Sequence, residues 1–223
     1  MQAQSDSFIA PPCFDEITIL YQDDYLLLIE KPSGLLSLSG KNPLNKDSVH
    51  FRLVQDFPSA TLPHRLDFGT SGIMVVALNK AINGHIGKQF QARSVSKTYT
   101  ALLHGHLSSN QGCIDFPIAK DAENFPLQKI CHETGKPAQS IYEVTERLTQ
   151  PFASRVVFTP GSGRTHQLRI HSQQIGHPIL GCDLYAHDEA FKLAPRLLLH
   201  ASTLEFEHPI YNEKIKGHSV CPF

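Results

Sequence analysis

Residues 63–72 read Pro-His-Arg-Leu-Asp-Phe-Gly-Thr-Ser-Gly, and the apolar run Ile73 to Leu78 follows them directly. The apolar run predicts a buried strand, and the polar, glycine-containing residues before it predict a tight loop at the strand's edge. Binding and catalytic residues concentrate on loops that a rigid scaffold positions. An Asp in an arbitrary loop is more often a turn or helix-cap residue. Because Asp67 lies close to Arg65 in the sequence, in a loop at the edge of a buried strand, we interpret it as a catalytic carboxylate.

The same stretch resembles the signature of a known enzyme family. His64-Arg65-Leu66-Asp67 followed by Thr70-Ser71-Gly72 is similar to the motif of the RluA family of RNA pseudouridine synthases. The order His-Arg-Leu-Asp-x-x-Thr-Ser-Gly is specific. It favours a catalytic role for Asp67 over a turn or helix-cap role. His-Arg-x-Asp and Asp-Phe-Gly also occur in protein kinases, but a kinase needs two separate Asp residues, a Gly-rich loop and a strand Lys. These are missing, so we reject a kinase.

Length and composition indicate an ordinary globular protein. The chain has 223 residues, enough for one large domain or two small ones, and it is 41% hydrophobic and 18% charged. No apolar run approaches the roughly 20 residues of a membrane span. The first residues lack the basic start and apolar core of a signal peptide. We therefore expect a cytoplasmic protein.

Cysteine usage and charge limit the kind of site. The five cysteines are scattered, odd in number and never in a C-x-x-C pair, which argues against a disulfide framework and a zinc ribbon. The net charge of −1 counts mildly against a nucleic-acid partner, although a neutral total is compatible with a basic cleft and an acidic back. The 13 histidines add positive charge at lower pH.

Strands dominate the predicted elements, and helices interrupt them irregularly, which indicates an α+β protein rather than regular βαβ units. Residues 1–15 are predicted to be a flexible N-terminal arm. Strands are predicted at 17–21, 25–31, 73–78, 96–105, 139–148, 154–159, 197–201 and 202–206, and helices at 48–57, 79–93, 166–174 and 188–194. Asn79 is the expected N-cap of the second helix.

The resemblance implies the rest of the architecture. It extends from Tyr21 to about Phe206 and includes Lys31-Pro32-Ser33-Gly34-Leu35 and the closing His208-Pro209. It implies one catalytic domain over residues 16–223, with a mixed, mostly antiparallel β-sheet, flanking helices and a central RNA-binding cleft. We expect no N-terminal S4 RNA-binding domain, since only about 20 residues precede the first strand.

Pseudouridine formation breaks the bond between uracil N1 and the sugar, turns the ring and rebonds it through C5. Nothing enters from outside, so no cofactor is expected. The reaction needs an ionised nucleophile or base and a pocket for a base taken out of its stack. Whether Asp67 attacks the sugar C1′, attacks the uracil ring or assists elimination stays open.

Two further site residues follow from the resemblance. The segment Gly163 to His171 is similar to the family's third motif, whose Arg, here Arg169, forms an ion pair with the catalytic Asp. A buried Asp needs such a cation to stay ionised. Lys97-Thr98-Tyr99 is similar to the second motif, whose Tyr stacks on the target base. A lone strand Tyr is more often a core residue.

RNA contacts are predicted near the motifs that contain Asp67 and Arg169. Arg65 is expected to fill the gap left by the flipped nucleotide, and His64 to support the loop at the RNA-binding face. The glycine-containing loop 161–163 fails the dinucleotide-binding pattern at His166, and we expect its backbone to meet RNA phosphate. His166 and His171 are five residues apart, which disfavours a zinc site. The candidate RNA contacts are Lys31, His64, Arg65, Lys88, Arg93, Lys97, Lys129, Lys136, Arg164 and His166, although for any one lysine or arginine a solvated surface charge is the more common role.

The predicted function is therefore an RNA pseudouridine synthase. The short length and secondary motifs are similar to family members that act on both a tRNA anticodon stem-loop and large-subunit (23S) ribosomal RNA. One alternative is a pseudouridine synthase that modifies only one of these RNAs. A second is a non-catalytic RNA-binding module. A third is a hydrolytic nucleosidase, although glycosidases usually need two carboxylates. A monomer is expected, since no heptad pattern occurs.

Overall fold

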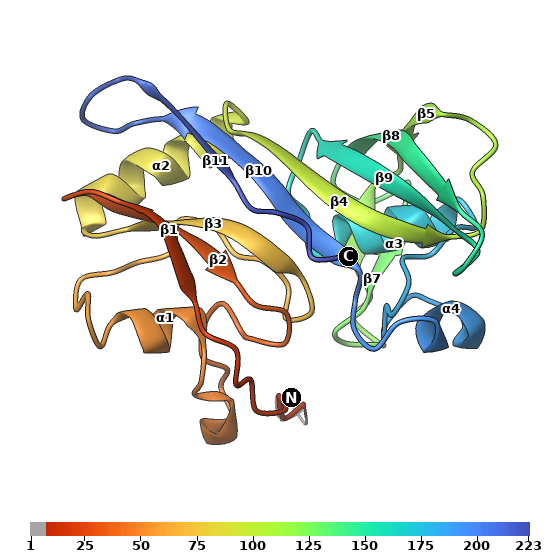
Figure 1. Cartoon of the computed structure of the whole chain (residues 1–223), viewed down its shortest axis with the longest axis horizontal. Helices are drawn as coiled ribbons and strands as arrows, with labels where there is room; N and C mark the ends of the chain where they lie inside the picture. Colours follow the sequence, from red (N-terminus) through yellow and green to blue (C-terminus); the bar gives the residue numbers. More distant parts are fainter. Residues whose placement is uncertain (1–7) are drawn as a thin grey trace. The chain divides into compact units, whose positions relative to one another are not determined.

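The computed structural model describes residues 8–223, and these divide into two compact units. The first unit takes the chain up to Val95 together with Thr203–Val220, and the second takes Ser96–Ser202 with Cys221–Phe223. Figure 1 follows the chain from one unit to the other by colour.

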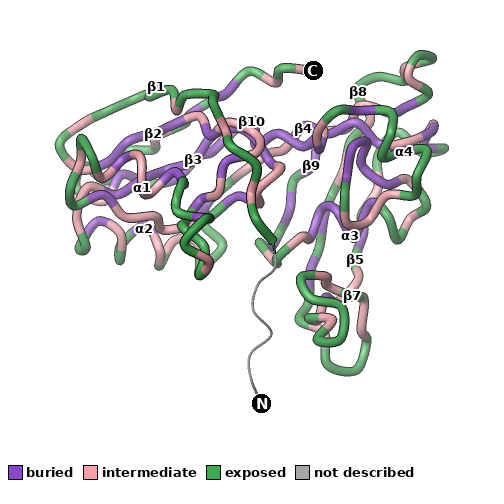
Figure 2. Tube along the Cα trace, turned by 90° about the horizontal axis from the view of Figure 1, so that it is seen from below, coloured by how far each residue is buried: buried purple, intermediate pink, exposed green. Residues whose placement is uncertain are grey.

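Strands β2 (Leu26–Lys31) and β3 (Ser71–Ala77) form the interior of the first unit. Every residue of β3 is buried, and five of the six residues of β2 are buried as well. An uninterrupted apolar run, rather than an alternating one, is typical of a strand covered on both faces. Figure 2 shows these two strands in purple beside the green of β1 (Thr18–Gln22), whose five residues are all exposed.

The strands of the first unit follow the order β1-β2-β3-β10, and β11 (Lys214–His218) pairs with β10 (Leu199–Glu207). The pairs β1/β2, β2/β3 and β10/β11 are antiparallel. β10 belongs to both units, because the boundary falls between Ser202 and Thr203. The two short strands predicted at 197–206 are thus one longer strand, and that prediction of two elements is wrong.

The helices of the first unit are the 3₁₀ turn η1 (Pro43–Asn45), α1 (Val49–Leu53) and α2 (Lys80–Ala92). Asn79 caps α2 as predicted, since its side-chain oxygen accepts a hydrogen bond from the Ile82 amide at 3.0 Å. Helix α1 ends at Leu53, four residues before the predicted end at Phe57. The chain continues in turns and reaches Pro58, which disfavours helix at the residue before it.

The second unit contains the sheet order β10-β4-β9-β8-β5 and a separate two-stranded hairpin, β6/β7. The pairs β4/β9, β8/β9 and β5/β8 are antiparallel. The elements are β4 (Ser96–His104), β5 (Gln111–Asp115), β6 (Ile118–Lys120), β7 (Gln128–Ile130), β8 (Gln139–Leu148), β9 (Ala153–Pro160), α3 (Gln167–Gln174) and α4 (Asp188–Lys192). Apart from α1 and β10, the predicted helices and strands are confirmed to within two residues at each end.

The core of the second unit lies between β4, β9 and α3. Ala101, Val156 and Phe158 are fully buried there, and Leu168 of α3 packs into the same cluster. This packing fixes one face of α3 against the strands, and so fixes the direction in which the helix presents its polar residues.

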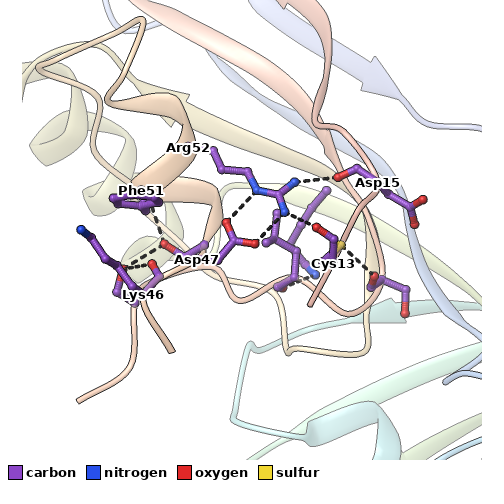
Figure 3. A network of polar contacts seen from close by, with 11 residues as sticks. Cys13, Asp15, Lys46, Asp47, Phe51 and Arg52 are labelled. Carbon is purple, nitrogen blue, oxygen red and sulfur yellow. Dashed lines mark hydrogen bonds and ion pairs between the residues drawn. The ribbon is translucent and has the colours of Figure 1, made fainter. Parts of the chain in front are cut away.

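The segment before β1 is tied to the first unit. Arg52 donates hydrogen bonds to the carbonyls of Cys13 and Asp15 at 2.5 and 2.6 Å, and to both carboxylate oxygens of Asp47 (Figure 3). Asn45 accepts from the Ala10 amide at 2.8 Å and donates to the Phe8 carbonyl at 2.7 Å. Residues 1–7 of the predicted flexible arm lie outside the described residues, and the flexibility of the arm stays a prediction.

Within residues 8–223, no helix combines the length and the hydropathy that crossing a membrane requires.

Asp23 joins the β1–β2 turn to the segment after β10. Its carboxylate accepts hydrogen bonds from the Tyr25 and Leu26 amides, the Tyr21 hydroxyl and Nε2 of His208, at 2.7–3.0 Å. Burial raises the pKa of this carboxyl, but the hydrogen bonds, led by those from the two amides, outweigh burial and hold its pKa below the ordinary value.

Replacement of Asp23 is therefore expected to destabilise the protein in a pH-dependent way. Asp23→Ala leaves buried donors unpaired, and we expect the free energy of unfolding to fall by about 1–3 kcal/mol at pH 7. Because the folded pKa is depressed, this contribution is complete above the unfolded pKa of about 3.9 and is lost as the pH falls through the folded pKa. Urea unfolding at several pH values measures it.

The control for this experiment is Asp24→Ala, which removes an exposed neighbouring carboxylate. The expectation for Asp23 is contradicted if the Asp23 variant is as stable as this control at pH 7, or if the difference between them does not shrink as the pH falls well below about 3.9.

Candidate active site

The turn that carries Asp67 is held by hydrogen bonds to the residues around it. The Phe68 carbonyl accepts from the Gly34 amide at 2.9 Å, and the Gly69 carbonyl accepts from the Ser33 hydroxyl at 2.7 Å. Within the turn, the Thr70 amide donates to the Asp67 carbonyl at 3.1 Å. The backbone on the C-terminal side of Asp67 is thus fixed to the 33–34 turn.

On the N-terminal side, Leu66 anchors the turn. Its side chain is buried, and its amide and carbonyl both bond to the Ser37 hydroxyl, at 3.2 and 2.8 Å. Asp67 itself is partly buried. A carboxylate held in this way is preorganised, because little of its backbone is left to order when a substrate binds.

Lys31 lies beneath this turn and is completely buried. Its ammonium donates hydrogen bonds to the carbonyls of Pro32, Leu35 and Phe68, at 2.7, 2.8 and 3.2 Å. A buried ammonium is stable only when its donors are satisfied. This placement does not support the predicted RNA contact by Lys31 and indicates a residue that holds the turn carrying Asp67.

His64 also supports the turn. Its Nε2 accepts a hydrogen bond from the Val75 amide of β3 at 3.1 Å, and its ring stacks on Phe90 of α2 with centroids 4.6 Å apart. The predicted loop-supporting role agrees with these contacts. Arg65, the next residue, is exposed.

Tyr99 lies on β4 opposite Phe158 of β9. It is partly buried and packs against the core of the second unit, with Ala101 two residues further along the same strand face. Lys97 precedes Tyr99 on that face and is also partly buried. Core packing therefore supports one side of the Tyr99 ring.

Arg169 lies on α3, and its side chain is only 5% exposed. Its guanidinium donates to Asp183 at 2.5 Å and to the Cys182 sulfur at 3.3 Å, and it lies over the Tyr185 ring at 5.5 Å. Asp67 belongs to the first unit and Arg169 to the second, and their predicted ion pair stays a prediction.

The loop before α3 is organised by Gln167, which uses its whole side-chain amide. The carbonyl oxygen accepts from the Ser162 hydroxyl at 2.7 Å and the Arg164 amide at 3.0 Å. The amide nitrogen donates to the Gln139 carbonyl at 2.8 Å and the Ser140 hydroxyl at 3.0 Å. This role was not predicted from the sequence, because the partners of Gln167 lie far from it in the chain and leave no local pattern.

Two further predicted RNA contacts lie at this loop. Arg164 is partly exposed, and its Nε donates to the Pro137 carbonyl at 3.2 Å. His166 has a left-handed backbone, with φ of 55°, at the N-terminus of α3, and its Nδ1 lies 2.9 Å from the Tyr185 hydroxyl.

His171, on the other side of α3, is a core residue. Its ring contacts the Ser140 hydroxyl at 2.9 Å and the Phe116 carbonyl at 3.0 Å, and burial lowers the pKa of the imidazole. Among residues 8–223, no group of three or more His, Cys, Asp or Glu side chains is arranged to hold a metal ion.

Comparison with known proteins identifies the family. The family model for RNA pseudouridylate synthase matches residues 25–174. The chain is 49% identical over 213 residues to the dual-specificity RNA pseudouridine synthase RluA of Escherichia coli (strain K12), covering 96% of this chain and 97% of the relative. It is 43% identical over 202 residues to the protein of the same name from Vibrio vulnificus, covering 89% and 81%.

Solved structures agree with this assignment. Human RNA Pseudouridylate Synthase Domain Containing 1 matches with a TM-score of 0.79 and 30% identity, covering 96% of this chain and 86% of that one. Human RNA Pseudouridylate Synthase Domain Containing 4 shares the fold at a TM-score of 0.73 and 24% identity, covering 92% and 88%. These likenesses confirm the predicted α+β fold with a mostly antiparallel sheet. The predicted RNA-binding cleft stays a prediction.

The buried position of Lys31 leads to a testable expectation. Lys31→Met keeps an unbranched apolar chain but removes the donor to three carbonyls, so we expect the free energy of unfolding to fall by about 1–3 kcal/mol, together with a loss of catalytic rate. Urea unfolding measures the first effect, and single-turnover kinetics measures the second.

Lys41→Met, at an exposed lysine of the same unit, is the matched control. A Lys31→Met protein with wild-type stability but weakened RNA binding would instead make Lys31 an RNA contact.

Proposed function

The chain belongs to the RNA pseudouridylate synthase family, and from that premise we propose that it modifies two kinds of RNA, a tRNA anticodon stem-loop and large-subunit (23S) ribosomal RNA. Its activity is that of an isomerase that converts uridine in RNA to pseudouridine. The observation that carries the proposal of two substrates is the match, over nearly the whole of both chains, to relatives named dual-specificity enzymes.

In the proposed reaction, the bond between uracil N1 and the ribose C1′ breaks and a bond from C5 to C1′ forms. The proton on C5 is lost to solvent, and N1 gains a proton, so atoms balance without a co-reactant. We assign the carboxylate that starts this exchange to Asp67. The anchored turn around Asp67 supports the assignment, since a fixed carboxylate contributes orientation that a mobile one lacks.

Arg169 is the proposed cationic partner of Asp67. Its guanidinium is shielded from water, so its charge acts through a low dielectric and is screened less than a surface charge. A cation in that setting is suited to keep a nearby carboxylate ionised.

Tyr99 is the proposed stacking platform for the target uracil. Its ring rests on the core of the second unit, which supports a fixed ring plane. Arg65, Lys97, Arg164 and His166 are further proposed RNA contacts, and the exposure of Arg65 is compatible with insertion into an RNA helix. We further propose that the protein acts in the cytoplasm as a monomer and without a cofactor.

The proposal of two substrates predicts pseudouridine in two separate transcripts. Purified protein incubated with a tRNA transcript and with a 23S ribosomal RNA fragment is expected to modify a small number of uridines in each. Carbodiimide treatment followed by primer extension maps them, and transcripts that lack the recognised stem-loop serve as controls.

Modification of only one RNA class would contradict the proposed dual specificity while leaving the activity intact. Modification of neither would contradict the proposed substrates.

The proposed role of Tyr99 predicts different effects of two substitutions. If stacking is the main role, Tyr99→Phe keeps the ring and is expected to retain most of the rate. Tyr99→Ala removes a contact worth about 1–3 kcal/mol, which corresponds to a rate loss of about 5- to 150-fold. Single-turnover kinetics with one RNA substrate measures both. Equal losses would instead place the function on the hydroxyl group.

A further inference from the structure

One short segment surrounds the Arg169 guanidinium on three sides. Nε donates to the Cys182 sulfur at 3.3 Å, Nη2 donates to Oδ1 of Asp183 at 2.5 Å, and the Tyr185 ring lies 5.5 Å from Cζ. All three residues follow α3 within the turn that begins at Gly181. The helix supplies the arginine, and the segment 181–185 supplies its surroundings.

The contact with Asp183 is the charged one. The Arg169 side chain is 5% exposed, whereas that of Asp183 is 61% exposed. A buried cation needs a paired anion, and an anion that stays hydrated on its far side supplies one at lower desolvation cost than a buried carboxylate would. The Tyr185 ring adds a cation–π contact on the face of the guanidinium.

The segment is itself rigid. Gly181 has φ of +68°, and a Cβ at this position would lie 1.9 Å from the Arg196 carbonyl oxygen, so only glycine fits the turn. Its amide donates to the Ala190 carbonyl at 3.0 Å. At the other end, the Tyr185 hydroxyl accepts from the Gln128 amide of β7 at 2.8 Å and pairs with Nδ1 of His166. Asp183 is therefore presented from a fixed frame.

A guanidinium is planar, and its five N–H donors point in fixed directions. Once Nε and Nη2 are bonded to Cys182 and Asp183, the directions of the remaining donors are set. Lysine has no such property, because an ammonium is a rotating point charge.

We propose that Asp183 is a positioning residue, which holds the Arg169 guanidinium in the orientation that its catalytic partner requires. The inference rests on the proposed function, in which Arg169 pairs with Asp67. Asp183 acts on the reaction through Arg169 and does not contact the RNA base.

The test compares Asp183→Asn with wild type under single-turnover and steady-state conditions. We expect kcat to fall by about 10- to 100-fold, as for a small misplacement of a reacting group, with KM for RNA changed less than about 2-fold. Asp183→Glu, which restores the carboxylate, is expected to recover part of the rate. Asp188→Asn removes a carboxylate that is 97% exposed and lies 3.9 Å from Lys192, so it is the charge-matched control and should keep the wild-type rate.

A double-mutant cycle separates positioning from general support of the fold. In an Arg169→Gln background, Asp183→Asn is expected to cause little further loss of stability in urea, because its partner is already gone. Asp188→Asn is expected to have the same small effect in both backgrounds. An Asp183→Asn effect of equal size with and without Arg169 would overturn the contact, whether or not the double variant has measurable activity.

The two proposals fail in different ways. If wild type modifies RNA and Asp183→Asn does so at the wild-type rate, the positioning role is overturned and the proposed function stands. If wild type modifies no RNA tested, the proposed function fails and the positioning role falls with it.

Discussion

The contact between the Lys31 ammonium and the Phe68 carbonyl is the constraint on which the turn carrying Asp67 depends. Lys31 ends β2, in the interior of the first unit, and its three carbonyl partners come from the turn after β2 and from the turn before β3. A charge in this position is costly unless every donor is used, so the two turns must keep their relative placement. Because Asp67 directly precedes Phe68, its backbone position is fixed by the same contact.

The second unit uses a buried cation in a different way. Arg169 contacts a carboxylate, a thiol and an aromatic ring. The three carbonyls that accept from Lys31 fix the backbone of two turns. Asp183 pairs with Arg169 and orients its planar donors. The two arrangements match the two roles that we assign, a structural clamp for Lys31 and a positioned catalytic partner for Arg169.

Local sequence signals were sufficient for much of the fold. The apolar run after Gly72 predicted β3, and the Asn79 cap marked the start of α2, because each signal concerns neighbours in sequence. The C-terminal end of α1 and the unbroken course of β10 were not predicted. The role of Lys31 depends on its burial, and the roles of Gln167 and Asp183 depend on hydrogen bonds to residues distant in sequence. A pattern of neighbouring residues reveals neither burial of a lysine nor such bonds. Asp67 was assigned because its motif is specific, and its catalytic role stays a prediction.

Tritium release from uridine C5 tests the central claim, that the Asp67 carboxylate drives isomerisation of a uridine in RNA. Purified wild type and Asp67→Asn are incubated with 5-tritiated tRNA and 23S transcripts, and RNA binding is measured on the same samples. The account predicts release by wild type alone, with RNA binding largely unchanged in the variant. Release by Asp67→Asn at a rate comparable to wild type would contradict it.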